Sequence, residues 1–404
     1  MPSFQEARRI ILESVSPLGA EIVPALEAVG RVLAEDVRAP FDLPRWDNSA
    51  MDGFALRAQD ADRPGGLRVS GYVPAGTTPA GAVAEGTAVR VLTGAPIPPG
   101  ADAVVPVEHT EEQGGTVRPL RPIGAGQNVR RRGEDIRAGE VVLAAGTVLG
   151  PAELSALASC SRLAVPVVRR ARVAILSTGD ELVEPGAPLA PGLIHDSNAW
   201  ALAAAVRQAG GVPAALGIAR DDREALRRLL REGLAADALV TSAGVSVGDR
   251  DLVREVLEEL GVRQLFWKID IKPGRPTAFA LAGRTPVFSL PGNPVATLLT
   301  FDQLVRPALL RAMGHERVLR PLVPAALRDG LRRKPGRVEF VRVRLERSAG
   351  ALVATSAGDQ ATGMLGTLLR ADGIVVVPAD RGTIEPGGAV EVQVLRGELE
   401  RWDA

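Results

Sequence analysis

The segment Leu239–Asp251, which reads LVTSAGVSVGDRD, has the composition of a phosphate-binding loop. A short apolar run leads into small residues and closes on Asp249 and Asp251. Small residues let a backbone approach an anion, successive N–H groups can form an anion-binding nest, and a following helix adds partial positive charge. Acids beside such a loop suit a hard cation that bridges to phosphate oxygens. No Gly-Lys-Ser/Thr follows, so this is not a Walker loop, and taken alone it also fits an ordinary strand-to-helix connection.

Acidic residues also follow two earlier predicted strands. Asp180 and Glu181 come after RVAILSTG, and Asp221 and Asp222 come after GIAR. Ligands of open α/β sheets bind beyond the carboxyl ends of the strands, so acids at several such ends favour a magnesium–phosphate site. Each acid alone is better explained as a helix N-cap, which suits Asp221 and Asp222 before a predicted helix at 223–234.

A group of cations lies in FWKIDIKPGRP, at residues 266–276. Alternation with a period of two predicts a strand with Trp267, Ile269 and Ile271 on one face and Lys268, Asp270 and Lys272 on the other. Arg275 adds a cation in the next turn. The chain has only one further lysine, Lys334. Arg does not replace the compact lysine charge at a tight anion site, so two lysines in one strand favour anion binding over a solvated face in which Asp270 pairs with its neighbours.

Asparagine is similarly rare and occurs only at Asn48, Asn128, Asn198 and Asn293. Asn198 ends a polar loop, HDSN, and Asn293 lies in SLPGNP, at residues 289–294. In that turn Gly292 and Asn293 permit a positive φ, and the prolines fix the backbone so that its amides can face a ligand. On its own, this turn also fits a structural role.

Three polar segments interrupt the β-prone N-terminal part of the chain. RWDNSAMDGFA occupies residues 45–55, VLTGAPIPPGADAVV holds Thr93 in a turn rich in Gly and Pro, and VRRRGED occupies residues 129–135. The arginine triplet of the last segment fits a solvated face as well as it fits a binding site.

The composition excludes several classes of protein. The 404 residues include 48 basic and 48 acidic ones, so no overall field favours nucleic acid or an anionic membrane as a partner. A single cysteine, Cys160, excludes a disulfide framework, and one Cys with three His cannot form a zinc finger. No secretory signal or long apolar span occurs, so we expect a cytoplasmic protein.

The pattern along the chain predicts a multidomain protein of α/β plus β class. A helix is expected at 4–14, and short β-prone runs cut by Gly and Pro fill residues 37–148. From about Ala171, alternating strands and helices predict a central doubly wound parallel α/β domain. From about Leu319 the chain returns to β-strands, which predict a small C-terminal β-barrel or sandwich.

Eight of these segments, in this order, resemble the motifs of the molybdopterin molybdenumtransferase family, which includes the E domain of gephyrin. They are DNSAMDGFA, LTGAPIPPGADAVV, RRRGEDI, STGDEL, HDSN, TSAGVSVGDRD, KIDIKPGRP and LPGNP. Each alone is a weak signal, but eight in order are highly specific and span almost the whole chain.

The resemblance implies a reaction, a set of domains and an assembly. Adenylated molybdopterin would be hydrolysed in the presence of molybdate and Mg²⁺, with release of AMP and with molybdenum left on the pterin dithiolene. The protein would be a homodimer whose active site is shared between the α/β domain of one subunit and the N-terminal domains of the other. The implied domains are an elongated α+β domain at 1–44 and 136–168, an inserted β-rich domain at 45–135, an α/β molybdopterin-binding domain at 169–317 and a β-barrel at 318–404.

The resemblance and the patterns above together assign roles to residues. Catalytic roles are expected for Asp52, Thr93, Asp135, Glu181, Lys268 and Lys272. Substrate contacts are expected for Arg130, Ser242, Gly244, Ser246, Arg275, Pro291, Gly292, Asn293 and Pro294, and Asp221 and Asp251 are the expected Mg²⁺ ligands. Lys272 and Arg275 would receive molybdate. Cleavage of a phosphoanhydride needs mainly positioning and charge neutralisation, so the scarcity of His is no objection.

The chain departs from the family pattern at a few positions. Ala243 stands where the family usually has Gly, and Arg275 stands where it usually has Lys, which keeps the charge but changes its geometry. GDQATGMLGTLL is a loose match in which Thr362 and Thr367 stand in a stretch usually richer in Ser, so little weight rests on a ligand contact there.

Two other functions are compatible with parts of the pattern. Molybdopterin adenylyltransferases share the α/β domain, but they are normally far shorter and lack the β-rich flanks. A non-enzymatic scaffold like gephyrin is the other alternative, although nothing here resembles the fused domain and linker of that protein.

Overall fold

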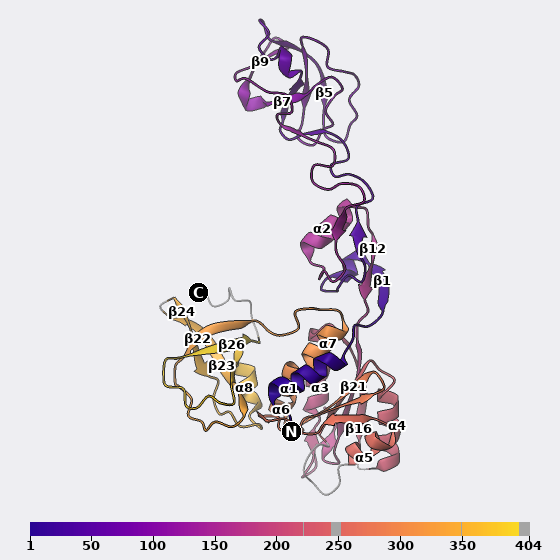
Figure 1. Ribbon diagram of the computed structural model, residues 1–404, viewed down its shortest axis with the longest axis vertical. Helices are drawn as coiled ribbons and strands as arrows, with labels where there is room; N and C mark the ends of the chain where they lie inside the picture. The colour runs from indigo at the N-terminus through magenta and orange to yellow at the C-terminus, as the bar shows by residue number, and fades with distance from the viewer. Residues whose placement is uncertain (221, 244–251, 349, 396–404) are drawn as a thin grey trace. The chain divides into compact units, whose positions relative to one another are not determined.

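The computed structural model describes residues 1–220, 222–243, 252–348 and 350–395. The chain forms two compact units (Figure 1). Unit 1 contains residues 1–23, 28–34 and 166–404, and unit 2 contains residues 24–27 and 35–165. The N-terminal segment therefore folds with the C-terminal part of the chain. The finer division into four domains stays a prediction.

Unit 1 contains a six-stranded sheet in the order β16-β13-β17-β21-β20-β18. Its strands are β13 (Arg172–Thr178), β16 (Val212–Ala219), β17 (Ala238–Ser242), β18 (Arg263–Phe266), β20 (Ala278–Ala282) and β21 (Thr285–Leu290). The first four in the sheet order are parallel, which confirms the predicted α/β domain. β20 alone runs antiparallel to its neighbours β21 and β18, because a tight turn joins it directly to β21 and a tight turn can join only antiparallel neighbours.

Helices cover both faces of this sheet. They are α1 (Phe4–Ser14), α3 (Ser197–Gln208), α4 (Arg223–Gly233), α5 (Leu252–Glu259), α6 (Pro294–Thr300), the π-helical turn η4 (Phe301–Val305) and α7 (Arg306–Ala312). Val173 and Ile175 of β13 pack in the core with α1, α3 and α7, while Ala174 and Leu176 pack with α4 and α5. Successive strand residues point to opposite faces, so this alternation is the signature of a sheet buried on both sides.

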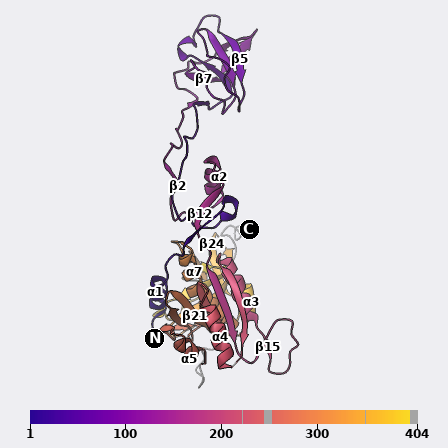
Figure 2. The same ribbon diagram turned by 90° about the vertical axis from the view of Figure 1, so that its right-hand side faces the viewer.

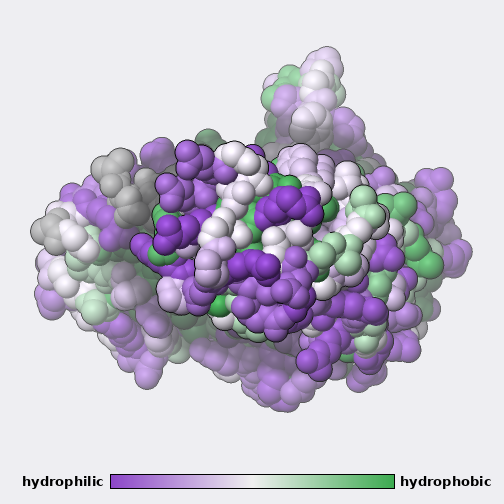
Figure 3. Space-filling view, turned by 90° about the horizontal axis from the view of Figure 1, so that it is seen from above, coloured by the Kyte–Doolittle hydropathy of each residue, from purple (hydrophilic) through white to green (hydrophobic). Residues whose placement is uncertain are grey.

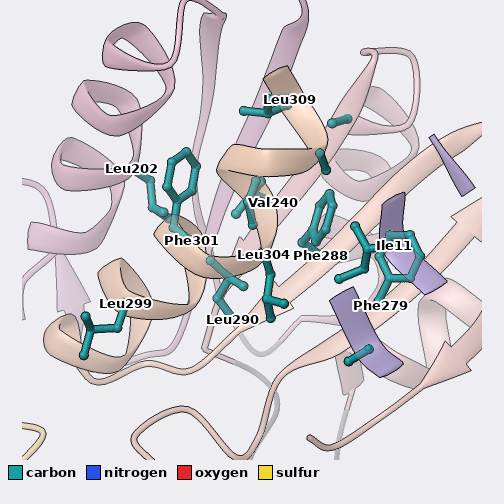
Figure 4. Close-up of a cluster of buried hydrophobic side chains, with 14 of the residues drawn as sticks. Ile11, Leu202, Val240, Phe279, Phe288, Leu290, Leu299, Phe301, Leu304 and Leu309 are labelled. Carbon is teal, nitrogen blue, oxygen red and sulfur yellow. The ribbon is translucent and has the colours of Figure 1, made fainter. Parts of the chain in front are cut away.

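Figure 4 shows the larger of these two cores. Strand residues such as Val240 and Phe288 meet Leu202 of α3, Phe301 of η4 and Ile11 of α1. The predicted helix at 4–14 is confirmed as α1, and Ser3 caps it by accepting a hydrogen bond from the Glu6 amide at 3.2 Å. The helix is thus part of the α/β core.

The C-terminal part of unit 1 is a closed five-stranded barrel. Its strands are β22 (Leu322–Leu327), β23 (Val338–Ser348), β24 (Ala351–Ser356), β25 (Gly373–Val377) and β26 (Gly388–Val394). They follow the order β23-β24-β22-β26-β25, and β25 pairs again with β23 to close the barrel, as predicted. The short helix α8 (Leu365–Arg370) lies between β24 and β25 in the chain, and β19 (Ile271–Lys272) pairs with β23 in parallel.

Unit 2 is built on a six-stranded sheet in the order β7-β4-β6-β5-β9-β8. Its strands are β4 (Gly53–Leu56), β5 (Leu67–Val73), β6 (Thr87–Val91), β7 (Ala103–Pro106), β8 (Thr110–Gln113) and β9 (Thr116–Pro119). Phe54 and Leu56 enter one hydrophobic cluster and Ala55 enters another, so both faces of the sheet are covered. These short strands separated by turns agree with the β-rich region predicted for this part of the chain.

Shorter elements complete the chain. In the N-terminal part they are β1 (Ala20–Pro24), η1 (Ala25–Ala28), β2 (Val37–Arg38), β3 (Asn48–Ser49), η2 (Ala58–Asp60), η3 (Val107–His109), β10 (Val129–Arg130), β11 (Val141–Leu143), α2 (Pro151–Ser159) and β12 (Ala164–Val168). In unit 1, β14 (Leu182–Val183) and β15 (Ile194–His195) pair in a loop that projects beside α3 (Figure 2). That loop forms one wall of the site described below.

The visible face in Figure 3 is dominated by hydrophilic residues, with hydrophobic ones scattered among them. Within the described ranges, no helix combines the length and apolar character needed to cross a bilayer.

Candidate active site

A cavity of about 380 Å³ opens where β13, β17 and β21 end. Its lining residues are Glu181, Leu182, Ile194, Asn198, Ser242, Ala243, Pro276, Pro291, Gly292 and Asn293. In the sheet, β13 has β16, the next of these strands in the chain, on one side and β17 on the other. The strand order therefore reverses between β13 and β17. Open α/β sheets bind ligands at such a reversal, beyond the carboxyl ends of the strands.

Asn198, in the first turn of α3, joins two walls of this cavity. Its Nδ2 donates to Oγ of Ser242 at 2.8 Å and to the carbonyl oxygen of Gly292 at 2.7 Å. A carbonyl can only accept, so this contact fixes which end of the amide is the nitrogen. The Oδ1 atom of Asn198 is buried without a hydrogen-bond partner among the described residues. Asn198 therefore holds a buried acceptor with unused hydrogen-bonding capacity beside the cavity.

Ser242 supplies the matching donor. Its Oγ accepts from Asn198, and its own hydroxyl hydrogen has no acceptor among the described residues. The side chain is 1% exposed, and a buried donor without an acceptor is costly. Asn198 and Ser242 together can orient a ligand through one acceptor and one donor without adding charge.

The turn from Pro291 to Pro294 is held rigidly against α6. Oγ1 of Thr297 donates to the carbonyl oxygens of Pro291 at 2.5 Å and Asn293 at 2.9 Å. Nδ2 of Asn293 donates to Oγ1 of Thr362 at 3.1 Å, so a loop of the barrel contacts the cavity rim.

The expectation of a positive φ in this turn is wrong. Asn293 has φ −69° because it occupies the N-cap position before α6. Gly292 is needed for space instead, since an added Cβ would lie 3.2 Å from Cβ of Ala243. The positive φ belongs to Ala243, at +70°, a region that glycine adopts more easily than alanine. Glycine, which the resemblance leads us to expect at this position, would adopt this φ at lower cost.

Glu181 brings a carboxylate to the cavity beyond β13. A Cβ on Gly179 would lie 2.5 Å from Oε2 of Glu181, so glycine leaves the space that the carboxylate uses. Asp222 instead caps α4 by accepting from the Glu224 amide at 3.1 Å, which confirms the helix-cap interpretation for this acid. Asp221, Gly244, Ser246, Asp249 and Asp251 lie outside the described residues.

The described residues alone do not fit a magnesium site. No group of three His, Cys, Asp or Glu side chains among them is placed to hold a metal ion. Mg²⁺ keeps several water ligands and is usually bound by one or two carboxylates together with substrate phosphates, and Glu181 supplies the only carboxylate that lines this cavity in the described part of the chain.

The cationic segment is less regular than its sequence predicts. Only Ile271–Lys272 forms a strand, because the Ile271 amide donates to the carbonyl of Ile269 at 3.0 Å and so turns the chain at Asp270. The alternation survives in the burial of Ile269 and Ile271 and the exposure of Lys272. Lys272 lines a different cavity, described below, and of this segment only Pro276 reaches the cavity at Ser242. Lys268 is half-buried and Arg275 is exposed.

In unit 2, Asp52 and Thr93 form a direct pair. Oδ1 of Asp52 accepts from the Thr93 amide at 2.6 Å and from its hydroxyl at 2.7 Å. These hydrogen bonds, the backbone one first, hold the pKa of Asp52 below its ordinary value. The family resemblance predicted roles for both residues, and the structure brings them together.

The arginine triplet of unit 2 separates into two kinds. Arg131 pairs with Asp47 at 2.7 Å and Arg132 pairs with Asp42 at 2.5 Å, so these two arginines fix the local structure. The side chain of Arg130, on β10 opposite Asn48, has no ion pair within the described ranges. The triplet is therefore neither a wholly solvated face nor a wholly functional one. Asp135 is exposed in the loop after β10.

Arg342 is a residue that the sequence patterns missed. It is fully buried on β23, and its Nη2 donates to the carbonyls of Asp359 at 3.2 Å and Ala361 at 3.3 Å. Nε and Nη1 have no partner among the described residues, and burial lowers the pKa of this guanidinium. Arg342 thereby holds the loop that brings Thr362 to Asn293. No signal marked it among so many arginines, whereas the rarity of asparagine does mark Asn198.

Fold and site together define a multidomain α/β protein that can bind a polar small molecule at the reversal point of its central sheet. Three family models match the chain: "MoeA N-terminal region (domain I and II)" at 2–161, "Probable molybdopterin binding domain" at 174–311 and "MoeA C-terminal region (domain IV)" at 324–395.

Complete relatives give the same result. The chain is 38% identical to molybdopterin molybdenumtransferase 2 of Mycobacterium tuberculosis, with 98% of this chain and 99% of the relative covered. It is 36% identical to the molybdopterin molybdenumtransferase of Haemophilus influenzae, with coverages of 97% and 98%. The crystal structure of a molybdopterin biosynthesis MoeA protein from Pyrococcus horikoshii superposes with a TM-score of 0.84 at 34% identity, covering 98% and 99% of the two chains. The chain belongs to the molybdopterin molybdenumtransferase family, as its motifs predict.

Proposed function

We propose that this protein transfers molybdenum from molybdate to adenylated molybdopterin, releasing AMP and forming molybdenum cofactor. The observation that carries the proposal is the cavity at Ser242, into which five separate family motifs bring residues. STGDEL supplies Glu181 and Leu182, and KIDIKPGRP supplies Pro276. HDSN supplies Asn198, TSAG supplies Ser242 and Ala243, and LPGNP supplies Pro291 to Asn293. Relatives of the same length carry the name of this activity.

The neutral groups of the cavity suit the polar parts of such a substrate. A pterin ring carries N–H donors, and Oδ1 of Asn198 is an acceptor without a partner among the described residues. The Ser242 hydroxyl would donate to an oxygen of the ligand, and Glu181 would orient the ligand or the attacking water. The rigid turn at 291–294 would position the ligand, since phosphoanhydride cleavage depends mainly on positioning and charge neutralisation.

Cations would handle the oxyanion. Lys272 and Arg275 are exposed and would receive molybdate as fixed positive charge, with Lys268 beside them in the chain. A phosphate-bound Mg²⁺ would supply charge neutralisation, held by Asp221 and Asp251, with Gly244 and Ser246 in the phosphate loop.

The N-terminal residues enter the proposal through a homodimer. Asp52, Thr93, Arg130 and Asp135 of one subunit would complete the site of the other, in a cytoplasmic protein. The direct hydrogen bonds between Asp52 and Thr93 support a shared role for this pair.

The test measures AMP released by the full-length protein from adenylated molybdopterin, with and without molybdate. We expect molybdate-dependent release, and we expect Ser242→Ala to reduce it roughly tenfold because a buried hydrogen bond to the ligand is lost. Release that is independent of molybdate contradicts the proposal. Formation of adenylated pterin from ATP and free pterin would instead identify an adenylyltransferase.

A further inference from the structure

A second cavity in unit 1, of about 460 Å³, lies between β19 and the loop that leads into β23. Its lining residues are Asp270, Lys272, Arg332, Arg333, Lys334, Pro335, Gly336, Arg337 and Glu339. Five of these are cations and two are carboxylates, which leaves a surplus of three positive charges. The cavity shares no lining residue with the one at Ser242.

One of the two carboxylates, Glu339, already interacts with two of these cations. Oε1 of Glu339 lies 3.5 Å from Nζ of Lys272 and 3.8 Å from Nε of Arg333. The side chains of Arg332, Lys334 and Arg337 have neither a hydrogen bond nor an ion pair within the described ranges. Three like charges in six consecutive residues repel one another unless an anion joins them.

The loop that carries these charges is fixed by its backbone. The side chain of Arg333 is 2% exposed, and it donates from Nη1 to the carbonyl of Pro378 at 2.7 Å and from Nη2 to the carbonyl of Arg337 at 2.5 Å. The Gly336 amide donates to the carbonyl of Ala379 at 2.8 Å. One arginine thus anchors the loop while its neighbours face the cavity. Charges held in place in this way bind an anion at a lower entropic cost than flexible ones do.

The lysine usage of the chain points the same way. Lys272 and Lys334 are two of only three lysines in a chain whose other basic residues are arginines, and both line this cavity. A lysine ammonium is a compact charge with three donors, which suits a small tetrahedral anion better than a flat or extended one. The net charge of the chain is zero, so these cations are not part of a generally basic surface.

We propose that this cavity is a capture site for a compact, doubly charged oxyanion. The proposal rests on the function proposed above and extends it, because the loop at 332–337 would complete the site around Lys272 and hold molybdate apart from the nucleotide. The same chemistry would also accept the phosphate of a nucleotide. The separate lining of the two cavities favours the free oxyanion.

The test is calorimetric titration of the full-length protein with sodium molybdate and, separately, with AMP. The variants are Lys334→Ala and Arg337→Gln, and the matched control is Arg344→Gln, which removes an exposed arginine of β23 that does not line the cavity. We expect each variant to weaken molybdate binding roughly tenfold and leave AMP binding unchanged, and we expect sulfate and added salt to compete in the wild type. Thermal melting checks that the variants are folded.

The outcomes separate the two proposals. Unchanged molybdate and AMP binding in both variants, or losses matched by Arg344→Gln, overturns the capture site even if AMP release still depends on molybdate. Weakened AMP binding with unchanged molybdate binding supports an oxyanion site but assigns it to the nucleotide phosphate. If the variants lose molybdate binding while the wild type releases no AMP, the capture site stands and the proposed reaction fails.

Discussion

The two cavities of unit 1 are built on opposite principles. The cavity at Ser242 is lined mostly by neutral groups, and the buried side chain of Asn198 links two strand ends there by hydrogen bonds. The cavity at Lys272 is lined by exposed cations on a backbone-anchored loop. Neutral hydrogen-bonding groups act at contact distance and favour one orientation of a ligand. Exposed charges attract an anion over several ångströms, and salt weakens that attraction. A reaction that joins a large polar molecule to a small anion needs both kinds of site.

Among the substitutions that test this comparison, loss of Asn198 should reduce the rate of AMP release the most. Asn198→Ala removes two hydrogen bonds that tie β17 to the turn at Gly292, at roughly 1–3 kcal/mol each, so we expect molybdate-dependent AMP release to fall about 100-fold. Gln208→Ala, on the exposed end of the same helix, should leave the rate within about twofold. Comparable rates for the two variants would show that the neutral cavity does not orient the substrate.

The close approach of Gly292 and Ala243 offers a test by steric rescue. Gly292→Ala places a Cβ 3.2 Å from that of Ala243, so one strand end must shift, and we expect about a tenfold loss of kcat/KM. Adding Ala243→Gly removes the opposing methyl group and relieves the φ of +70°, so the double variant should recover most of the rate. A double variant no better than Gly292→Ala would mean that the contact does not set the geometry of the cavity.

Thr93 should control the ionisation of Asp52 in unit 2. Thr93→Val removes the hydroxyl donor but keeps the backbone N–H, so the pKa of Asp52 should rise part of the way toward its ordinary value. Because the pKa is lowered in the folded protein, these hydrogen bonds stabilise the fold fully above the usual aspartate range, near about pH 4, and the stabilisation is lost as pH falls through the lowered pKa. Carbon-detected NMR titration measures the change.

Asp47 serves as the internal control for that titration. Its pKa is lowered mainly by a hydrogen bond from the Arg132 amide, which Thr93→Val does not touch. A shift at Asp47 equal to that at Asp52 would indicate a general change in unit 2 rather than loss of one hydroxyl donor.

The sequence predicted the fold classes well because they depend on local periodicity. The alternation of strands and helices after Ala171 and the β-strands after Leu319 are properties of short segments, and both appear as predicted. The antiparallel strand β20 was missed because its small, fully apolar sequence, AFALA, shows no period. The regular strand expected at 267–272 failed because a backbone hydrogen bond between Ile269 and Ile271 overrides the side-chain alternation.

Site residues were predictable where rarity or a motif marked them. Asn198 and Asn293 are two of four asparagines and both line the cavity at Ser242. The anchoring role of Arg333 and the burial of Arg342 depend on which carbonyls lie beside them in the folded barrel. Residues close in sequence, such as Arg130, Arg131 and Arg132, were inseparable until their partners from distant segments were known.

Loss of the contact between the barrel and the rim of the Ser242 cavity should change the kinetics the least. Thr362→Val removes the hydroxyl that accepts from Nδ2 of Asn293 at 3.1 Å. Asn293 is exposed and Thr362 is half-buried, so water replaces the lost partner, and we expect only about a twofold rise in KM with kcat unchanged. The matched control is Thr355→Val on β24, whose hydroxyl is buried without a partner in the described part of the chain, so its loss should leave the kinetics unaltered. A drop in kcat on Thr362→Val would mean that the barrel takes part in the chemical step, because a contact that only steadies the rim affects substrate binding and the transition state equally.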